Sequence, residues 1–476
     1  MTAQSASLLT RPAVELAELI RSGELHSREL IEASLAQISA HQNLNAFTYV
    51  DAEGALVAAD AIAPGDPRPF AGVPIAIKEL NAVAGQPFTM GSRLFGAFHA
   101  DHDAYVVRRL RAAGFVLVGR SNAPEFGITP TTEPTRFGAT RNPWNPDRIS
   151  GGSSGGAAAA VAAGMLPVAH GSDGGGSLRI PAACCGLVGL KPSRGRISSG
   201  PELGDNLLST SGALTRSVAD SAALLDVMAG YEVGDATWAA PSSAPFATFV
   251  TRPPERLRIA FTTVAPLGTP VDPVCVEAVQ KAAQMLTALG HIVEERTPPV
   301  WQAPGLESDF NTLYAASVAS GVRAGAQVAQ RPPQPGDVEA LTWWFYEQGM
   351  RQSAAELLEA TARLEGYARG VIGFFSTCDV LLTPALAQRP LAIGDLDTRA
   401  SDPAAQWQKA AAFTPFTPIF NVTGQPAISV PLFQGADGLP LAVQLAGPPL
   451  GEGLLLALAA QLEAAHPWVD RRPPVQ

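Results

Sequence analysis

The sequence has few charged residues and no long apolar run. Only 16% of its 476 residues are Asp, Glu, Lys or Arg, against about 25% in a typical soluble protein. The net charge is −10 without long runs of one sign, which argues against a nucleic-acid-binding surface. No stretch reaches the ~18 apolar residues of a membrane span, and the first twenty residues lack a basic segment followed by an apolar one. We therefore expect no nucleic acid, no membrane and no export.

Cysteine is also scarce. The four cysteines, Cys184, Cys185, Cys275 and Cys378, form no Cys-x-x-Cys pair, which excludes a disulfide framework and a zinc site of that kind. A reducing cytoplasm fits this usage, and no metal is expected. The adjacent pair Cys184 and Cys185 is expected to pack as small hydrophobic side chains, because no cationic residue adjoins it to favour a thiolate.

Lysine is the rarest cation. Of 33 Lys and Arg residues only four are lysines: Lys78, Lys191, Lys281 and Lys409. Lys78 ends the apolar run AGVPIAIK, where two interpretations compete. It can be a strand-end lysine whose ammonium reaches solvent along its apolar stem. Alternatively it is a buried amine that desolvation holds neutral, and such an amine can act as a general base.

Glycine, proline and apolar residues are abundant. With 45 Gly, 41 Pro and 46% apolar residues, the chain is neither disordered nor a coiled coil. Predicted strands and helices alternate to the C-terminus without a shift in composition, which predicts one α/β domain over residues 1–476. Within it we distinguish a helical lead-in (1–70), a core (71–230) and a remainder completing the sheet and its loops (231–476).

The lead-in is predicted to form two amphipathic helices between residues 12 and 40, broken at Gly23, with Ser27 as the N-cap of the second. A later helix is expected to start at Asp272 and Pro273. Eight strands are predicted: residues 73–77, residues 115–118, MLPVA, RLRIAFTTV, HIVEE, DVLLTPA, PAISVPL and LAVQLAG. A closing helix is predicted to follow them in GEGLLLALAAQLEAAH.

Residues 151–155, GGSSG, match the G-x-S-x-G pattern of a strained turn that exposes a serine nucleophile. In a chain this rich in glycine, a flexible Gly/Ser turn is the alternative. The nucleophile turn would also need a catalytic histidine downstream. His170 ends the predicted strand MLPVA, His291 opens a strand and His466 lies in the tail helix, so each is interpreted as structural.

A second glycine loop follows at residues 171–177, GSDGGGS. Three consecutive glycines let backbone N–H groups converge on an anion without obstruction by Cβ atoms. No Gly-Lys-Ser/Thr and no G-x-G-x-x-G is present, so no nucleotide cofactor is indicated and an oxyanion fits better. Ser177 at the edge of this loop could attack a carbonyl, but it needs a base. No histidine qualifies, and a buried neutral amine remains.

These segments together resemble the amidase signature family. The resemblance rests on GVPIAIKE, RNPWNPDR, GGSSGGAAAAVAAG and GSDGGGSLRIPAACCGLVGLKP. It is strongest from Gly72 to Gly195 and extends to the lead-in, to GALTRSVADSAALLDVMAG and to FNVTGQPAISVP. The family implies a mixed central sheet covered by helices on both faces. It also implies hydrolysis of a small-molecule carboxylic amide without metal or cofactor.

By matching positions, the resemblance implies a Ser-Ser-Lys triad with Ser177 as nucleophile, Ser153 as bridging serine and Lys78 as base. The bond between Gly152 and Ser153 is then expected to be cis. Asp173 and Arg179 are expected to support the loop through hydrogen bonds. The developing oxyanion is expected to be bound by N–H groups of four consecutive residues, Gly174, Gly175, Gly176 and Ser177.

Two residues depart from the family pattern. Glu79 stands where many members have Asp, and Gly174 where many have a branched or small residue. Neither departure removes a reacting group. Position alone suggests a substrate pocket lined by MGSRLF, Phe126, Trp144, NTLY near 311 and PIFN near 418.

The substrate is less defined than the chemistry. The stretch GYEVGDATWAAP, together with ACCGLVGLKPSRGR, is similar to bacterial members related to hydrolases of the 6-aminohexanoate cyclic dimer. Other aliphatic or aryl amides are alternatives. So is a role as the A subunit of a tRNA-dependent amidotransferase, which acts on glutamine in a multi-subunit complex. A noncatalytic binding protein is a third possibility. Otherwise a monomer or homodimer is expected.

Overall fold

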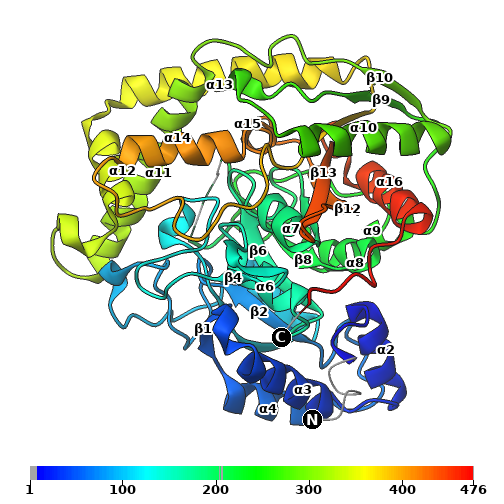
Figure 1. Ribbon diagram of the computed structural model, residues 1–476. Coiled ribbons are helices and arrows are strands. Elements are labelled where there is room, and N and C mark those ends of the chain that lie inside the picture. Colours follow the sequence, from blue (N-terminus) through cyan, green and yellow to red (C-terminus); the bar gives the residue numbers. More distant parts are fainter. Residues whose placement is uncertain (1–7, 203, 205–206, 475–476) are drawn as a thin grey trace.

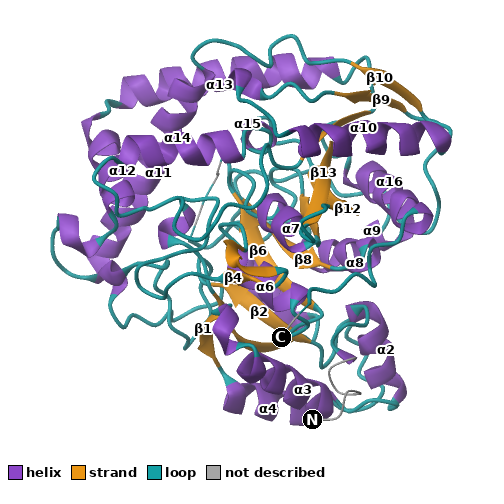
Figure 2. Ribbon diagram, viewed as in Figure 1, coloured by secondary structure: helices purple, strands orange, loops and turns teal. Residues whose placement is uncertain are grey.

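A computed structural model describes residues 8–202, 204 and 207–474 (Figures 1 and 2). Its main sheet has eight strands in the order β10 (Ile292–Glu295), β9 (Arg258–Phe261), β11 (Val380–Pro384), β13 (Pro440–Ala446), β12 (Ala427–Gln434), β7 (Val188–Lys191), β8 (Thr210–Thr215) and β6 (Val168–Asp173). The β10, β9 and β11 neighbours run parallel and the other pairs antiparallel. The expected mixed α/β sheet is therefore confirmed.

A smaller, separate sheet lies beside the main one, next to β6. It contains β1 (Phe47–Val50), β3 (Val116–Ser121) and β2 (Pro74–Lys78), and β4 (Arg141–Asn142) and β5 (Asn145–Ile149) form a separate hairpin. Strand β2 contacts β6, but in the described ranges no ladder of backbone hydrogen bonds joins them. We call this contact the seam. It brings Lys78 at the end of β2 beside the residues of β6.

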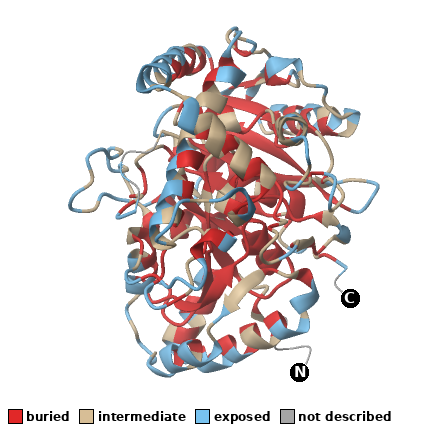
Figure 3. Ribbon diagram, turned by 90° about the vertical axis from the view of Figure 1, so that its left-hand side faces the viewer, coloured by how far each residue is buried: buried red, intermediate tan, exposed pale blue. Residues whose placement is uncertain are grey.

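Helices cover both faces of the sheet. Ile75 and Ile77 pack into one core and Ala76 into another, because successive strand side chains point to opposite faces. One face carries α2 (Ala13–Ser22), α5 (Tyr105–Ala112), α8 (Val218–Met228), α9 (Phe246–Phe249), α10 (Pro273–Ala288) and α16 (Glu452–Ala465). The other carries α3 (Ser27–Ala40), α4 (Ala52–Asp60), α6 (Gly155–Ala162), α7 (Arg179–Cys185), α13 (Ala354–Phe374) and α15 (Pro418–Val422). Figure 3 shows the buried residues concentrated along the strands between these layers.

A further group of helices stands beside the sheet, at the upper left of Figure 1. It consists of α11 (Leu306–Val328), α12 (Ala340–Arg351) and α14 (Pro403–Phe413), and α11 also packs against α13. Short 3-10 helices complete the chain: η1 (Gln42–Leu44), η2 (Arg93–Phe95), η3 (Glu125–Gly127), η4 (Pro266–Gly268) and η5 (Pro335–Asp337). Helices α11 and α14 border the cavity described below.

The lead-in follows the predicted pattern with one correction. Helix α2 ends at Ser22, and Gly23 adopts the left-handed conformation (φ 80°) that favours glycine at a helix C-terminus. Ser27 is not the N-cap of α3 but its first residue, and His26 is the N-cap. The Glu29 carboxylate accepts the N–H of His26, while the Ser27 hydroxyl donates to the carbonyl of Gly72. Ser27 therefore ties the helix to the loop before β2.

The predicted strand MLPVA is misplaced. Met165 closes helix α6 by donating its N–H to the Ala160 carbonyl, and strand β6 begins only at Val168. The strand then continues to Asp173, so the glycine loop is shorter than expected and His170 lies inside the strand. Pairing with β8 over the whole length of β6 explains the difference, because this long-range partner extends the strand through Gly171.

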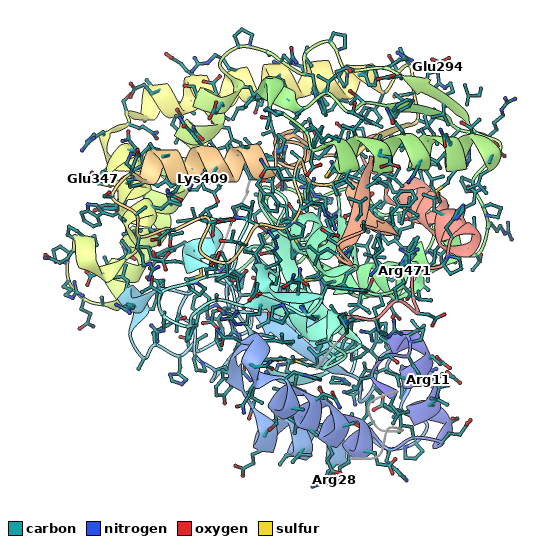
Figure 4. All side chains as sticks on the ribbon, viewed as in Figure 1. Arg11, Arg28, Glu294, Glu347, Lys409 and Arg471 are labelled. Atoms are coloured by element: carbon teal, nitrogen blue, oxygen red, sulfur yellow. The ribbon has the colours of Figure 1, made fainter. Side chains whose placement is uncertain are left out.

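Charged side chains lie mainly at the periphery. Figure 4 shows Arg28, Glu294 and Glu347 at the edge of the molecule. Lys409 and Lys281 are exposed, whereas Lys78 and Lys191 are among the largest fully buried side chains. Within the described ranges no helix is both long and apolar enough to cross a bilayer.

Candidate active site

Lys78 is fully buried at the end of β2, with its amine among serine oxygens. Its Nζ lies 2.8 Å from Ser153 Oγ, 3.0 Å from Ser172 Oγ and 3.3 Å from the Ser172 carbonyl oxygen. The strand-end interpretation with a solvated ammonium is therefore wrong. Ser153 Oγ is thus the nearest of three oxygen atoms within hydrogen-bonding distance of the amine.

Burial also changes the charge of this amine. Desolvation lowers the pKa of Lys78 to about 7, and the negative charge of Asp173 opposes this shift. A substantial fraction is therefore neutral near pH 7 and can accept a proton from a hydroxyl. Lys191 provides a comparison: burial lowers its pKa to about 7 as well, but its Nζ donates to the carbonyl of Pro192.

The GGSSG segment places Ser153 within reach of Lys78. The bond between Gly152 and Ser153 is cis, as the family resemblance implies. A Cβ atom on Gly152 would lie 2.5 Å from the carbonyl oxygen of Thr131, so only glycine fits there. The next helix, α6, starts at Gly155, whose N–H donates to Thr132 Oγ1. Close backbone approach, rather than flexibility, explains the glycines of this segment.

The second glycine loop joins β6 to α7 and carries Ser177. Asp173 holds the loop from inside: its carboxylate accepts the N–H groups of Gly176 (2.7 Å) and Leu178 (3.1 Å). The N–H of Gly176 is therefore engaged. The N–H groups of Gly174, Gly175 and Ser177 have no acceptor among the described residues. Three N–H groups of this loop are thus left without a protein acceptor in the described part of the chain.

A buried ion pair anchors the loop to the sheet. Arg179 and Asp173 are both fully buried and joined by two hydrogen bonds, from Nε at 3.0 Å and from Nη2 at 2.9 Å. Burial alone would raise the pKa of Asp173, but Arg179 and Lys191 hold it well below its usual range. Asn421 also donates to the Asp173 carboxylate and accepts from Arg179. The carboxylate is thus ionised and cannot serve as a proton carrier near neutral pH.

Ser153 and Ser177 face the same cavity, which has a volume of about 770 Å³. Ser177 Oγ forms no hydrogen bond to Ser153 Oγ in this structure, so only the Lys78–Ser153 half of the expected proton path is formed. Catalytic hydrogen bonds are often long in the absence of substrate and shorten when it binds.

The cavity wall agrees largely with the positional expectation. Met90, Phe95 and Phe126 line it, as do Asn311 and Tyr314 of α11 and Pro418 and Ile419 of α15. Trp144 is the exception, because its indole packs against Gly186 and donates to the carbonyl of Cys185. Cys184 and Cys185 are fully buried, and burial raises the pKa of both thiols. The expected packing role of this pair is therefore confirmed.

A buried carboxylate fixes one side of this wall. Glu125 accepts hydrogen bonds from the Ser92 hydroxyl (2.7 Å), the Thr342 hydroxyl (2.6 Å) and the N–H of Glu339 (2.7 Å). It thereby links the segment before η2 to helix α12. The neighbouring Phe126 adopts a positive φ of 49° and donates its N–H to the Met90 carbonyl.

Several residues of the site were not singled out from the sequence. Ser172 contacts the Lys78 amine, and Asn421 connects Asp173, Arg179 and the carbonyl of Leu208. Ser172 lies inside GSDGGGS and Asn421 inside FNVTGQP, so their segments were recognised but their contacts were not. Glu79 accepts from the side chains of Thr48 and Thr89, so this departure from the family pattern braces strand β1 and the loop at residue 89. Among the described residues no group of His, Cys, Asp and Glu could hold a metal.

Comparisons with known proteins agree with this geometry. A family model described as Amidase matches residues 29–456. A 6-aminohexanoate-cyclic-dimer hydrolase of Paenarthrobacter ureafaciens is 40% identical over 480 residues, covering 98% of this chain and 97% of the relative. A solved structure of 6-aminohexanoate cyclic dimer hydrolase complexed with substrate superposes with a TM-score of 0.93 at 39% identity, covering 98% of this chain and 99% of that one.

A more distant solved structure is that of the A subunit of glutamyl-tRNA(Gln) amidotransferase from Thermotoga maritima, with 28% identity, a TM-score of 0.77 and coverage of 100% of this chain and 99% of that one. The chain therefore belongs to the amidase family. It is an amidohydrolase that acts on linear or cyclic small-molecule amides.

The glycines of the second glycine loop allow a matched prediction. Gly176 has φ 130°, and a Cβ atom there would lie 2.3 Å from Thr417 Oγ1. A Cβ atom on Gly174 would meet nothing closer than 3.9 Å. We expect Gly176→Ala to displace the loop and lower kcat/KM about 100-fold, comparable to the loss of one oxyanion donor. Gly174→Ala should stay within a few fold of wild type. Equal losses in both variants would contradict this account of the loop.

Proposed function

We propose that the protein cleaves its amide through a seryl acyl-enzyme, with Ser177 as nucleophile, Ser153 as proton relay and Lys78 as base. The observation that carries this proposal is the fully buried Lys78 amine at 2.8 Å from Ser153 Oγ. A neutral amine in this position can take the proton of Ser153 while Ser153 takes that of Ser177. No metal ion and no cofactor takes part in the proposed reaction.

The first half of the reaction forms the ester. Ser177 Oγ attacks the carbonyl carbon, and the oxyanion accepts hydrogen bonds from the N–H groups of Gly174, Gly175 and Ser177. Gly176 contributes by shaping the loop, because its own N–H is bound to Asp173. The C–N bond then breaks, Ser153 gives its proton to the leaving nitrogen, and Lys78 returns a proton to Ser153. In the second half, water attacks the ester through the same relay and releases the acid.

Labelling of Ser177 tests this assignment. A fluorophosphonate should modify wild-type protein once per chain, at Ser177, because an activated serine attacks phosphorus as it attacks a carbonyl. The Ser177→Ala variant should remain unlabelled, and peptide mass spectrometry should locate the adduct. Absence of labelling in folded wild-type protein would favour a noncatalytic binding protein instead.

For the substrate we propose an uncharged aliphatic amide, and specifically the cyclic dimer of 6-aminohexanoate on which the named relatives act. The cavity wall is largely aromatic and aliphatic, and its charged residues are the carboxylates Glu202 and Glu307. In the described part of the chain no Lys, Arg or His lines the cavity. A substrate carboxylate would therefore be desolvated near like charges, whereas a ring amide has none.

The cavity carboxylates could also bind the ammonium group that forms when a cyclic amide is opened. When a cyclic amide is cleaved, the leaving amine stays attached to the acyl chain and becomes an ammonium group. Glu307 lies in the first turn of α11, is exposed, and forms no hydrogen bond or ion pair with the described residues. It is thus available to attract this ammonium group while water enters for deacylation.

A substrate panel tests the charge argument. We expect kcat/KM to be at least tenfold higher for the 6-aminohexanoate cyclic dimer than for the linear dimer with its free carboxylate. Converting that carboxylate to a primary amide should recover much of the difference, since it removes the charge and keeps the chain length. Preference for the free acid over its amide would overturn the charge argument without affecting the labelling result at Ser177.

The cavity argues against the amidotransferase alternative. Glutamine carries an α-carboxylate, and the described cavity wall offers no cationic side chain to bind it. We therefore expect glutamine to be a poor substrate and the chain to sediment as a monomer or homodimer. Copurification with other subunits, together with glutaminase activity, would favour the amidotransferase instead.

A further inference from the structure

Two buried side chains hold the backbone of Lys78 from behind the site. The N–H of Lys78 points across the seam to His170 Nδ1 on β6, at 3.4 Å. The carbonyl oxygen of Lys78 accepts from Arg120 Nη2 of β3, at 3.3 Å, and also from the N–H of Asn81 in the turn that follows, at 3.1 Å. His170 and Arg120 are both fully buried. Both polar backbone groups of this one residue are therefore bound by side chains.

The seam explains why a side chain is needed at this position. Strand β2 pairs with β3 on one side, where the N–H of Glu79 donates to the Ser121 carbonyl. The N–H of Lys78 points the other way, toward β6, where the described strands share no ladder. Without His170 this N–H would be a buried donor without an acceptor, which is energetically unfavourable and favours a shift of the strand end.

Arg120 holds the chain just beyond the same point. Its Nη1 donates to the Pro87 carbonyl at 3.0 Å, and its Nη2 donates to the Asn81 carbonyl as well as to that of Lys78. The guanidinium thus ties the turn that follows β2 to the strand end. Together the two side chains fix the position from which the Lys78 stem reaches Ser153.

The chemistry of His170 fits this role and no proton transfer. To accept the Lys78 N–H, Nδ1 must carry no proton, so the ring is neutral with its hydrogen on Nε2. Burial, together with the positive charges of Lys78 and Arg120, lowers the pKa of His170 to about 3. His170 Nε2 has no partner among the described residues. The ring therefore remains a neutral acceptor near neutral pH.

We propose that His170 and Arg120 are positioning residues that fix the Lys78 backbone across the seam, so that the amine meets Ser153 in the geometry required for proton transfer. The inference rests on the proposed role of Lys78 as base. It revises the expectation that His170 is merely structural, because its removal is predicted to affect the rate of serine activation and not only stability.

His170→Leu should lower kcat at least tenfold with little change in KM, because the cavity wall is untouched while the proton path is misaligned. The rate of fluorophosphonate labelling at Ser177 should fall by the same factor, since labelling reports serine activation independently of substrate binding. His291 provides the matched control: its Nδ1 accepts the N–H of Leu257 at 3.1 Å and its Nε2 contacts Gln461. His291→Leu should lower stability and leave kcat and labelling within twofold.

A polar pair of variants keeps the test valid if His170→Leu does not fold. In His170→Asn the amide oxygen takes the place of Nδ1, whereas in His170→Gln it lies near the position of Nε2. We expect Asn to restore most of the rate and Gln to restore little. Folded His170→Leu or His170→Gln protein with wild-type kcat and labelling rate would overturn the inference. Failure of wild-type protein to label at Ser177 would instead overturn the proposed function itself.

Discussion

Replacing Lys78 with alanine is expected to lower kcat/KM by at least about 10³-fold. A positioned general base contributes about 10²–10⁴ in rate, and residues that act as one catalytic unit can contribute more. In this protein the Lys78 amine is the only group of the described site that can take the Ser153 proton, because Asp173 is held ionised and its carboxylate is bound to Arg179. Steady-state hydrolysis of the best amide substrate measures the loss.

The pH dependence of kcat/KM also tests the role of Lys78 as the base. The pKa of Lys78 is lowered to about 7, and only the neutral amine can accept a proton. Wild-type kcat/KM should therefore rise with pH through about 7 and then level off. Lys191 is the control, because it is equally buried and its pKa is also lowered to about 7, but its Nζ donates to the Pro192 carbonyl and, within the described ranges, to no serine. Lys191→Met should leave the rising limb where it is.

Removing the Lys78 amine should raise the stability of the fold although it lowers activity. The unfolded chain holds the Lys78 proton up to about pH 10.4, whereas the folded chain loses it near 7, so the buried lysine destabilises the fold most at low pH. Lys78→Met should be more stable than wild type at pH 6, and the difference should shrink as the pH rises from 7 to above 10. Wild-type activity in folded Lys78→Ala would refute the role of the base.

Part of this site could be predicted from the sequence, because the residues concerned have distinctive local chemistry. The scarcity of lysine drew attention to Lys78, and the two glycine loops located Ser153 and Ser177, because close backbone approach requires glycine at fixed positions. The resemblance to the amidase signature family then assigned one role to each of them. Strand β2 and helix α10 were placed within a residue or so because their burial pattern and N-cap residue, Asp272, are encoded locally.

Other features depend on partners far away in the chain. Strand β6 extends to Asp173 because β8 pairs with it from residues 210–215, and no local pattern in MLPVAHGSD shows this. His26 rather than Ser27 caps α3 because the Ser27 hydroxyl is bound to Gly72, 45 residues away. The contacts of Asn421 with Asp173 cross 248 residues. The position of Trp144 outside the cavity likewise follows from packing against Gly186.

The ion pair beneath the nucleophile loop should be the largest single electrostatic contribution to stability. Asp173→Asn is expected to lower the free energy of unfolding by about 3–5 kcal/mol, because the Arg179 guanidinium would remain buried with only neutral partners. The double variant Asp173→Asn/Arg179→Gln should cost less than the sum of the two single changes, since it leaves no unpaired charge. Urea denaturation at pH 7 measures all three.

An exposed pair provides the matched control for this effect. Arg258 and Asp379 form a similar ion pair, but their side chains are 52% and 31% exposed, so Asp379→Asn should cost no more than about 1 kcal/mol.

The pKa of Asp173 is held well below its usual range, so the stabilisation that its carboxylate provides should be complete above about pH 4 and should decline only as the pH falls below that value. Equal costs at the buried and exposed pairs would show that the loop is anchored by other contacts. In that case the three N–H groups of Gly174, Gly175 and Ser177 would owe their orientation to the helix and strand that flank them rather than to the carboxylate of Asp173.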